Sequence, residues 1–231
     1  MEVELLSFYG TDRDIANSAW TSSTEQIKKE TRTNQEVARV VNYLIDNGHG
    51  SPLEQVVYKF HLRVPIFVSR QFLRHRIQSP NEMSGRYRTM LNEYYKLPSD
   101  VINILEANKM GDEIEAYNNL MTKQYNFYKG VLDKLDKKAD SYKRVREVMR
   151  GVLGTGYYTE IVTSINLRSL ANFFKQRLDK HAQKEMQEVA KMMLYEVIKS
   201  NSCPVAIARL EKKGWIVFPM LARRFESKES N

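Results

Sequence analysis

Residues 74–87 carry the sequence RHRIQSPNEMSGRY, in which most side chains can form hydrogen bonds. A proline and a glycine interrupt the stretch, so we expect irregular backbone with amide groups free to bind a ligand. The wider range 63–88 holds six arginines, no lysine and one acid, Glu82. Because a guanidinium grips phosphate in two places and keeps its charge when partly desolvated, this composition favours a phosphate-binding surface. The alternative is a solvated basic face.

Regular patterns on both sides of this stretch predict secondary structure. Alternating apolar residues indicate strands, and apolar residues at helical spacing indicate helices. A capping box at 33–36 marks the start of one helix, which ends at Asn47-Gly48. Strands are predicted at 2–9, 55–64 and 157–166, and helices at 12–20, 34–46, 65–73, 112–138, 142–152, 169–178 and 186–197.

These elements predict an α+β fold in which helices dominate. The three strands lie far apart in the chain, which favours a mixed or antiparallel sheet over a doubly wound one. A length of 231 residues fits one domain, and no linker-like stretch divides it. We therefore expect one helix-rich domain over 1–222, assembling as an oligomer, and a polar tail at 223–231.

Composition narrows the class of protein. The chain has 36 basic and 28 acidic residues, a net charge of +8 that suits phosphorylated or other anionic partners. Its single cysteine, Cys203, cannot form an internal disulfide, which favours a reducing compartment. The acidic N-terminus does not resemble a signal peptide, and no apolar run approaches the length of a membrane span. The expectation is a cytoplasmic protein with no membrane partner.

A second polar cluster follows the third predicted strand. It contains Asn166, Arg168, Asn172, Arg177 and His181. On a helix over 169–178, Asn172 and Gln176 would lie one turn apart, and Arg177 and His181 would share one side. This arrangement predicts a cation and an imidazole facing a cleft, with an exposed helix face as the alternative.

The sequence lacks several motifs that would identify a specific binding or catalytic site. The glycines at 151–156 have the wrong order for a dinucleotide fingerprint, and a turn between helix and strand explains them better. Four histidines without an HExxH pair and one cysteine give no metal site. Nothing around Cys203 would activate a thiol, so a small buried or capping residue is expected there. The residues alone predict binding of a phosphorylated, planar ligand with many acceptors.

The stretch 74–87 resembles the RHRxxSxNExSxRY signature of the flavin-dependent thymidylate synthases. Residues 48–54, GHGSPLE, are similar to that family's GHxSPxEH element, and 65–71 to its lead-in helix. Residues 166–173 and 177–183 resemble its second motif region. The sequence departs from the family pattern at three positions: Gln55, Pro80 and Gly154.

The resemblance implies a reaction. Family enzymes make dTMP from dUMP with methylenetetrahydrofolate as carbon donor, FAD as hydride carrier and NADPH as reductant. They use no cysteine nucleophile, and they assemble as homotetramers with active sites at subunit interfaces. The implied partners are therefore dUMP, the folate, and further copies of this chain, with no nucleic acid and no membrane.

The resemblance also implies residue roles. Arg177 would polarise the uracil ring and act as the catalytic residue. The residues implied for FAD are Ser51, Arg74, His75, Arg76, Glu82, Asn166, Arg168 and Asn172. Those implied for dUMP are Gln71, Arg74, Glu82, Met83, Ser84, Gly85, Arg86, Arg150 and Arg177. His49 and Tyr87 would belong to the region that meets folate or NADPH.

Two other functions fit parts of the sequence. Arginines interleaved with aromatic residues could clamp a nucleic acid, with affinity that falls steeply with salt. A nucleotide-binding protein without catalysis would bind dUMP but not convert it. Flavin absorbance in the purified protein would favour the enzyme over both.

Overall fold

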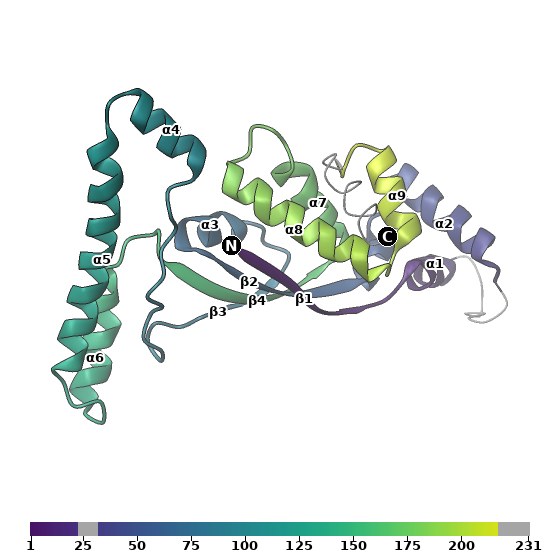
Figure 1. The fold of residues 1–231 in the computed structure, drawn as a ribbon. Helices are drawn as coiled ribbons and strands as arrows, with labels where there is room; N and C mark the ends of the chain where they lie inside the picture. The colour runs from purple at the N-terminus through teal and green to yellow at the C-terminus, as the bar shows by residue number, and fades with distance from the viewer. Residues whose placement is uncertain (23–31, 217–231) are drawn as a thin grey trace, which may run out of the picture. The chain divides into compact units, whose positions relative to one another are not determined.

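The structure, a computed structural model, describes residues 1–22 and 32–216 (Figure 1). The predicted boundary at 222 and the predicted tail at 223–231 lie outside the described residues. The elements are β1 (Glu2–Tyr9), α1 (Asp12–Trp20), α2 (Asn34–Asp46), η1 (Ser51–Gln55), β2 (Val57–Pro65), α3 (Ile66–Phe72), β3 (Ser79–Glu82), α4 (Ser99–Ala107), α5 (Gly111–Asp133), α6 (Asp140–Met149), η2 (Arg150–Val152), β4 (Tyr158–Asn166), α7 (Leu167–Arg177), α8 (Lys184–Ser200) and α9 (Pro204–Lys212).

The chain forms two compact units. The first unit contains residues 1–62, 71–81 and the chain from 161 on, and the second contains 63–70 and 82–160. Most of the sheet and α7 to α9 belong to the first unit, whereas α4, α5 and α6 belong to the second. Each unit is therefore described by itself.

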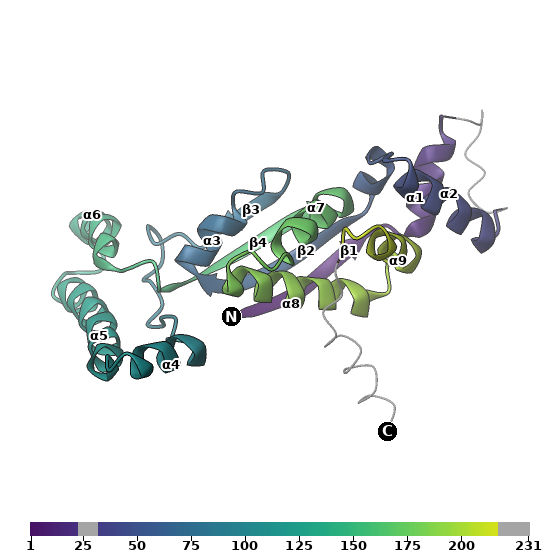
Figure 2. The same ribbon diagram turned by 90° about the horizontal axis from the view of Figure 1, so that it is seen from above.

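The sheet is antiparallel, with strand order β1-β2-β4-β3. This confirms the predicted α+β class and the three predicted strands, whose ends shift by at most two residues. In the first unit, Tyr58, Phe60 and Leu62 alternate along β2 and are fully buried. Both views show α7 and α8 lying over one face of the sheet (Figures 1 and 2). Buried Phe173 and Phe174 of α7 supply part of the core.

The prediction that residues 74–87 are irregular is wrong for β3, because Ser79–Glu82 form an edge strand. All four residues are exposed, so β3 shows none of the apolar alternation that identifies a strand. Pro80 cannot donate to a sheet hydrogen bond, and an edge position tolerates this. The departure at Pro80 therefore falls where a proline costs the sheet least.

Some helix boundaries also differ from the predictions. The helix predicted at 112–138 ends at Asp133, and beyond it the Asp136 carboxylate accepts a hydrogen bond from the amide of Lys138 (3.0 Å) in a turn. The helix predicted at 142–152 is α6 followed by the short η2. The glycines at 151–156 span η2 and the turn before β4, as predicted. Helices α4 and α9 were not predicted from the sequence.

Asp12 joins α1 to α9. Its carboxylate oxygens accept hydrogen bonds from the amides of Val205 and Ala206, both at 2.9 Å, in the first turn of α9. The side chain is buried, and burial raises its pKa against the lowering effect of these two hydrogen bonds. Asp12 thus caps a helix that begins about 190 positions further along the chain.

Replacing Asp12 with Ala is expected to lower the free energy of unfolding by about 1–3 kcal/mol, because two amides at the start of α9 lose their acceptor. Urea unfolding measures the effect. Asp112→Ala, which removes an exposed acid from the first turn of α5, is the matched control and should change stability by less than about 0.5 kcal/mol. Equal losses in both variants would contradict the capping role.

Within residues 1–22 and 32–216, no helix combines the length and the apolar character needed to cross a membrane.

Candidate functional site

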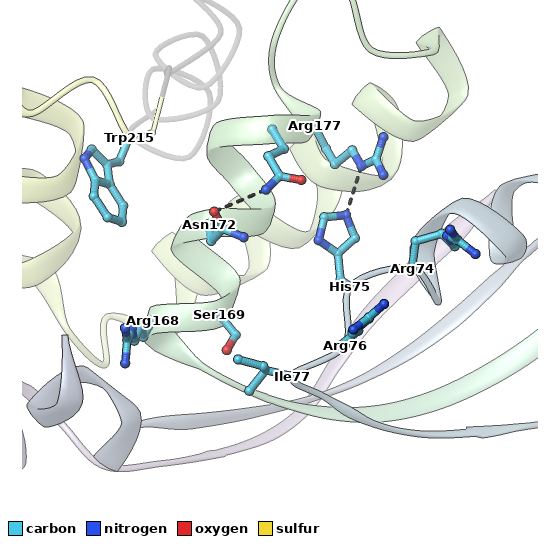
Figure 3. A pocket seen from close by; sticks show the side chains of 10 residues that line it. Arg74, His75, Arg76, Ile77, Arg168, Ser169, Asn172, Arg177 and Trp215 are labelled. Carbon is cyan, nitrogen blue, oxygen red and sulfur yellow. Dashed lines mark hydrogen bonds between the residues drawn. The ribbon is translucent and has the colours of Figure 1, made fainter.

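A cavity of about 560 Å³ in the first unit gathers residues from three segments (Figure 3). One segment follows α3, the second is α7, and the third follows α9. The described residues that line it are Arg74, His75, Arg76, Ile77, Arg168, Ser169, Asn172, Gln176, Arg177 and Trp215. The sequence predicts seven of these as candidate residues: Arg74, His75, Arg76, Arg168, Asn172, Gln176 and Arg177.

Helix α7 presents one face to the cavity. Its core side is fixed by Leu170, Phe173 and Phe174, which are all fully buried. Arg168, Asn172 and Gln176 follow at intervals of one turn on another side, and Gln176 Nε2 donates to Asn172 Oδ1 (3.2 Å). This confirms the prediction that Asn172 and Gln176 lie one turn apart on a helix.

Asn166 has a structural role that the sequence did not reveal. It is the N-cap of α7, and its Oδ1 accepts a hydrogen bond from the amide of Ser169 (2.9 Å). The side chain therefore fixes the start of the helix that carries Arg168 and Asn172.

The segment 74–77 is held by Gln78. Its Nε2 donates to the carbonyl oxygens of Phe72 (3.1 Å) and His75 (2.8 Å), and its Oε1 accepts from Thr163 Oγ1 (2.9 Å). One amide thus ties the end of α3, the segment 74–77 and β4 together. Gln78 occupies a position that the signature leaves open, so no motif pointed to it.

His75 and Arg177 form a direct pair within the cavity (Figure 3). Arg177 Nε donates to His75 Nε2 at 2.9 Å, and the imidazole packs edge-on against Phe173 with ring centroids 4.9 Å apart. Burial, and secondarily the Arg177 charge, lower the pKa of His75 to about 4. His75 is therefore neutral at pH 7, and its proton resides on Nδ1 because Nε2 accepts.

This lowered pKa predicts a pH dependence. Between the usual value of about 6.5 and the folded value of about 4, the unfolded chain binds the His75 proton and the folded chain does not. The free energy of unfolding should therefore fall as the pH decreases through this window. The slope corresponds to the uptake of at most one proton on unfolding. Urea midpoints of the wild type and His75→Asn between pH 7.5 and 5 test this. Identical slopes in the two proteins would contradict it.

The prediction that Arg177 and His181 share a helix face is wrong. Helix α7 ends at Arg177, and His181 lies in the following turn, where its amide donates to Asp179 Oδ1 (2.8 Å). This local side-chain hydrogen bond competes with continuation of the helix. Both residues nevertheless line a second open cavity, together with Lys175 and Asp179.

Arg168 contacts the segment that resembles the GHxSPxEH element. Its Nη1 donates to Glu54 Oε1 of η1 at 2.5 Å, so two predicted motif regions meet. Ser51 is exposed at the start of η1, and the exposed His49 stacks on Tyr43. Neither Ser51 nor His49 is among the described residues that line the cavity.

Gln71 completes the predicted residues of the first unit. Its amide hydrogen-bonds to Gln183, which precedes α8. Arg74 and Arg76 are exposed side chains of the cavity. The cavity thus brings together Arg74, Arg76 and Arg177 with the remaining motif residues of α7.

In the second unit, the segment after β3 packs against α6 and η2. Gly85 is buried, and a Cβ atom there would lie 3.0 Å from Arg150 Cδ. Arg86 Nε donates to Glu147 Oε1 (2.9 Å), and Arg150 Nε donates to the Glu147 carbonyl (3.1 Å). Gly85, Arg86 and Arg150, predicted to bind one ligand, therefore lie together around Glu147.

The other predicted residues of the second unit flank this cluster. The Glu82 carboxylate accepts from Thr159 Oγ1 (2.9 Å), and the Met83 amide donates to the Glu160 carbonyl (2.8 Å). Ser84 Oγ accepts from the Arg86 amide (3.3 Å), whereas Tyr87 is 77% exposed. Glu147 was missed because nothing in the sequence links it to the arginine-rich stretch.

Cys203 is buried beside α9, as expected for a small core residue. Burial raises the pKa of its thiol to about 12, so it is protonated at neutral pH. A buried neutral thiol is a poor nucleophile. Among the described residues, no group of three or more histidine, cysteine, aspartate or glutamate side chains could hold a metal ion.

Comparison with known proteins gives a consistent result. The model of the family described as thymidylate synthase complementing protein matches residues 4–204. The flavin-dependent thymidylate synthase of Treponema denticola is 37% identical over 221 residues, which are 91% of this chain and 79% of that protein. The one of Pseudothermotoga lettingae is 36% identical over 207 residues, covering 87% of this chain and 86% of that protein.

The fold is also similar to a solved structure. A UMP/dUMP methylase, PolB from Streptomyces cacaoi, bound with 5-Br dUMP, matches with a TM-score of 0.78. The match covers 93% of this chain and 96% of that chain at 24% identity. At this identity the likeness establishes the fold alone.

Proposed function

The chain belongs to the flavin-dependent thymidylate synthase family and is a methyltransferase of that kind, and on this premise we propose that it converts dUMP to dTMP. The proposed carbon donor is methylenetetrahydrofolate, and the proposed reductant is NADPH acting through FAD. The observation that carries the proposal is the cavity, where both motif regions converge.

The cavity residues suit a flavin dinucleotide. Arg74, Arg76 and Arg168 offer guanidinium donors to a pyrophosphate, and Asn172 offers an amide to a ring or ribose. We assign FAD binding to these residues and to Ser51, His75, Glu82 and Asn166. When bound, the flavin supplies the hydride chemistry, and the protein orients it.

The family resemblance assigns the nucleotide to two groups of residues. Glu82, Met83, Ser84, Gly85, Arg86 and Arg150 of the second unit form the first group, in which Ser84 offers a hydroxyl and Arg86 and Arg150 offer cations. Gln71, Arg74 and Arg177 form the second group. His49 and Tyr87 are assigned to the region that meets folate or NADPH.

Arg177 is the proposed catalytic residue. Uracil C5 must become nucleophilic, and a guanidinium at N3 and O2 stabilises the negative charge that develops in the ring. Arginine keeps its proton, so it stabilises charge and does not transfer a proton. Neutral His75 accepts from Nε and thereby orients the guanidinium, which leaves the two Nη groups to face a ligand.

The proposal includes the assembly. We assign a homotetramer with shared active sites, in the cytoplasm, where dUMP, folate and NADPH are available. Sedimentation of the FAD-loaded protein tests the assembly. A monomer that retains FAD and full activity would contradict shared sites.

The decisive experiment is the absorbance spectrum of the purified protein followed by a dTMP assay. We expect flavin absorbance, and dTMP only when dUMP, methylenetetrahydrofolate and NADPH are all present. Flavin without dTMP would favour the nucleotide-binding alternative. A colourless protein that binds oligonucleotides in a salt-dependent way would favour the nucleic-acid alternative.

A further inference from the structure

Trp215 lines the same cavity but comes from a different part of the chain. It follows α9, beyond the residues 4–204 that the family model matches. Apart from Ile77, which is 66% exposed, it is the large apolar side chain among the described lining residues. An indole among arginine and amide side chains indicates that the cavity suits a ligand with a planar apolar part.

The backbone holds Trp215 in a defined place. Gly214 has a φ of +71°, and its amide donates to the Glu211 carbonyl (2.8 Å). The Trp215 amide donates to the Leu210 carbonyl (3.0 Å). These two hydrogen bonds form a Schellman motif at the end of α9, which fixes where the indole begins.

A side chain of α7 also contacts the indole. Lys175 Nζ lies over the ring, 5.1 Å from its centroid, in a cation–π contact. Trp215 is thus held by α9 through its backbone and by α7 through its ring. A ring held in this way is ready to stack on a ligand without first being ordered.

The position of Trp215 indicates which ring it meets. Figure 3 shows it on the opposite side of the cavity from Arg74 and Arg76. Under the proposed function, on which this step rests, Arg74 and Arg177 serve the nucleotide substrate, so the reacting ring of the flavin lies toward them. The other ring of the dinucleotide is adenine.

We infer that Trp215 is a stacking platform for the adenine ring of the bound dinucleotide. It is a binding residue for FAD that the family motifs do not contain. Aromatic stacking on a nucleobase is expected to strengthen binding by about tenfold or more.

The test uses the fact that the chain has two tryptophans, Trp20 and Trp215. Trp20 lies in α1 under the Arg32 guanidinium, so Trp20→Phe leaves Trp215 as the reporter. Flavin-free Trp20→Phe protein is titrated with ADP, which carries adenine but does not absorb tryptophan emission. We expect saturable quenching of Trp215, and no quenching by ADP in Trp215→Phe, where Trp20 is the reporter.

Binding constants give the second readout. Trp215→Leu should weaken ADP and FAD binding by about tenfold or more, Trp215→Phe should restore most of it, and FMN binding should not change. Gly214→Val, which strains the motif and displaces the indole, should resemble Trp215→Leu. Trp20→Leu is the matched control and should bind all three ligands as the wild type does.

Three results would overturn the inference: ADP leaves Trp215 emission unchanged, Trp215→Leu binds FAD normally, or the variant loses FMN and not ADP. The wild-type spectrum and dTMP assay separate this from failure of the proposed function. If the wild type holds flavin and makes dTMP, any of these results contradicts the stacking role of Trp215 and leaves the proposed function standing. A wild type without flavin contradicts both the stacking role and the proposed function.

Discussion

Arg177→Ala is expected to lower dTMP formation by at least about a hundredfold, because removing one donor that stabilises transition-state charge typically has an effect of this size. The affinity for dUMP should fall less, since the interaction strengthens as the uracil ring is activated. Single-turnover oxidation of pre-reduced flavin with saturating substrates measures turnover, and direct titration measures dUMP binding. Flavin reduction by NADPH should survive in this variant.

Two further variants sharpen this test. Arg177→Lys keeps the charge but loses the planar fork and the Nε donor to His75, so it should also be impaired. Arg39→Ala removes an exposed arginine from α2 and should leave turnover unchanged. Near-normal dTMP formation in Arg177→Ala would remove the residue from catalysis, and loss of dUMP binding alone would make it a substrate clamp.

Arg74→Ala is expected to weaken FAD retention by about ten- to a hundredfold, because a charge-assisted hydrogen bond to a ligand contributes roughly 1.5–3 kcal/mol. His75→Ala should also lose flavin, since Arg177 would lose its acceptor and Phe173 its packing partner. The ratio of flavin to protein after purification, and the FAD dissociation constant, measure both effects.

Arg70→Ala is the matched control for these variants. Arg70 belongs to the same arginine-rich stretch and is exposed near the end of α3, but it is not among the described cavity residues. It should retain wild-type flavin. If Arg74→Ala and His75→Ala also retain wild-type flavin, the assignment of residues 74–76 to FAD is wrong.

The secondary structure that could be predicted from the sequence is that in which buried and exposed residues repeat regularly. Strand β2 could be found because Tyr58, Phe60 and Leu62 alternate toward the core. Strand β3 could not, because all its residues are exposed and one is Pro80. The position of His181 was also missed, since it depends on the turn after α7, where the His181 amide donates to Asp179, and apolar spacing does not report this hydrogen bond.

The residues of the candidate site also divide into those that the sequence predicts and those that it does not. Arg74 and Arg177 could be named because they occupy motif positions, and the fold brings both to one cavity. Gln78, Glu147 and Trp215 could not, because their contacts are made with distant segments. The roles of these three residues depend on tertiary contacts, which the spacing of residues along the chain does not predict.

The cap that Asp12 places on α9 has a consequence for the order of folding. Its acceptor oxygens and their donors are separated by 193 and 194 positions, so the contact closes nearly the whole described chain. During synthesis, Asp12 emerges among the first residues, whereas the amides of Val205 and Ala206 emerge among the last. Contacts of such long range slow folding, because the loop must close before the contact stabilises it. The nascent first unit therefore completes its packing only after α9 has left the ribosome.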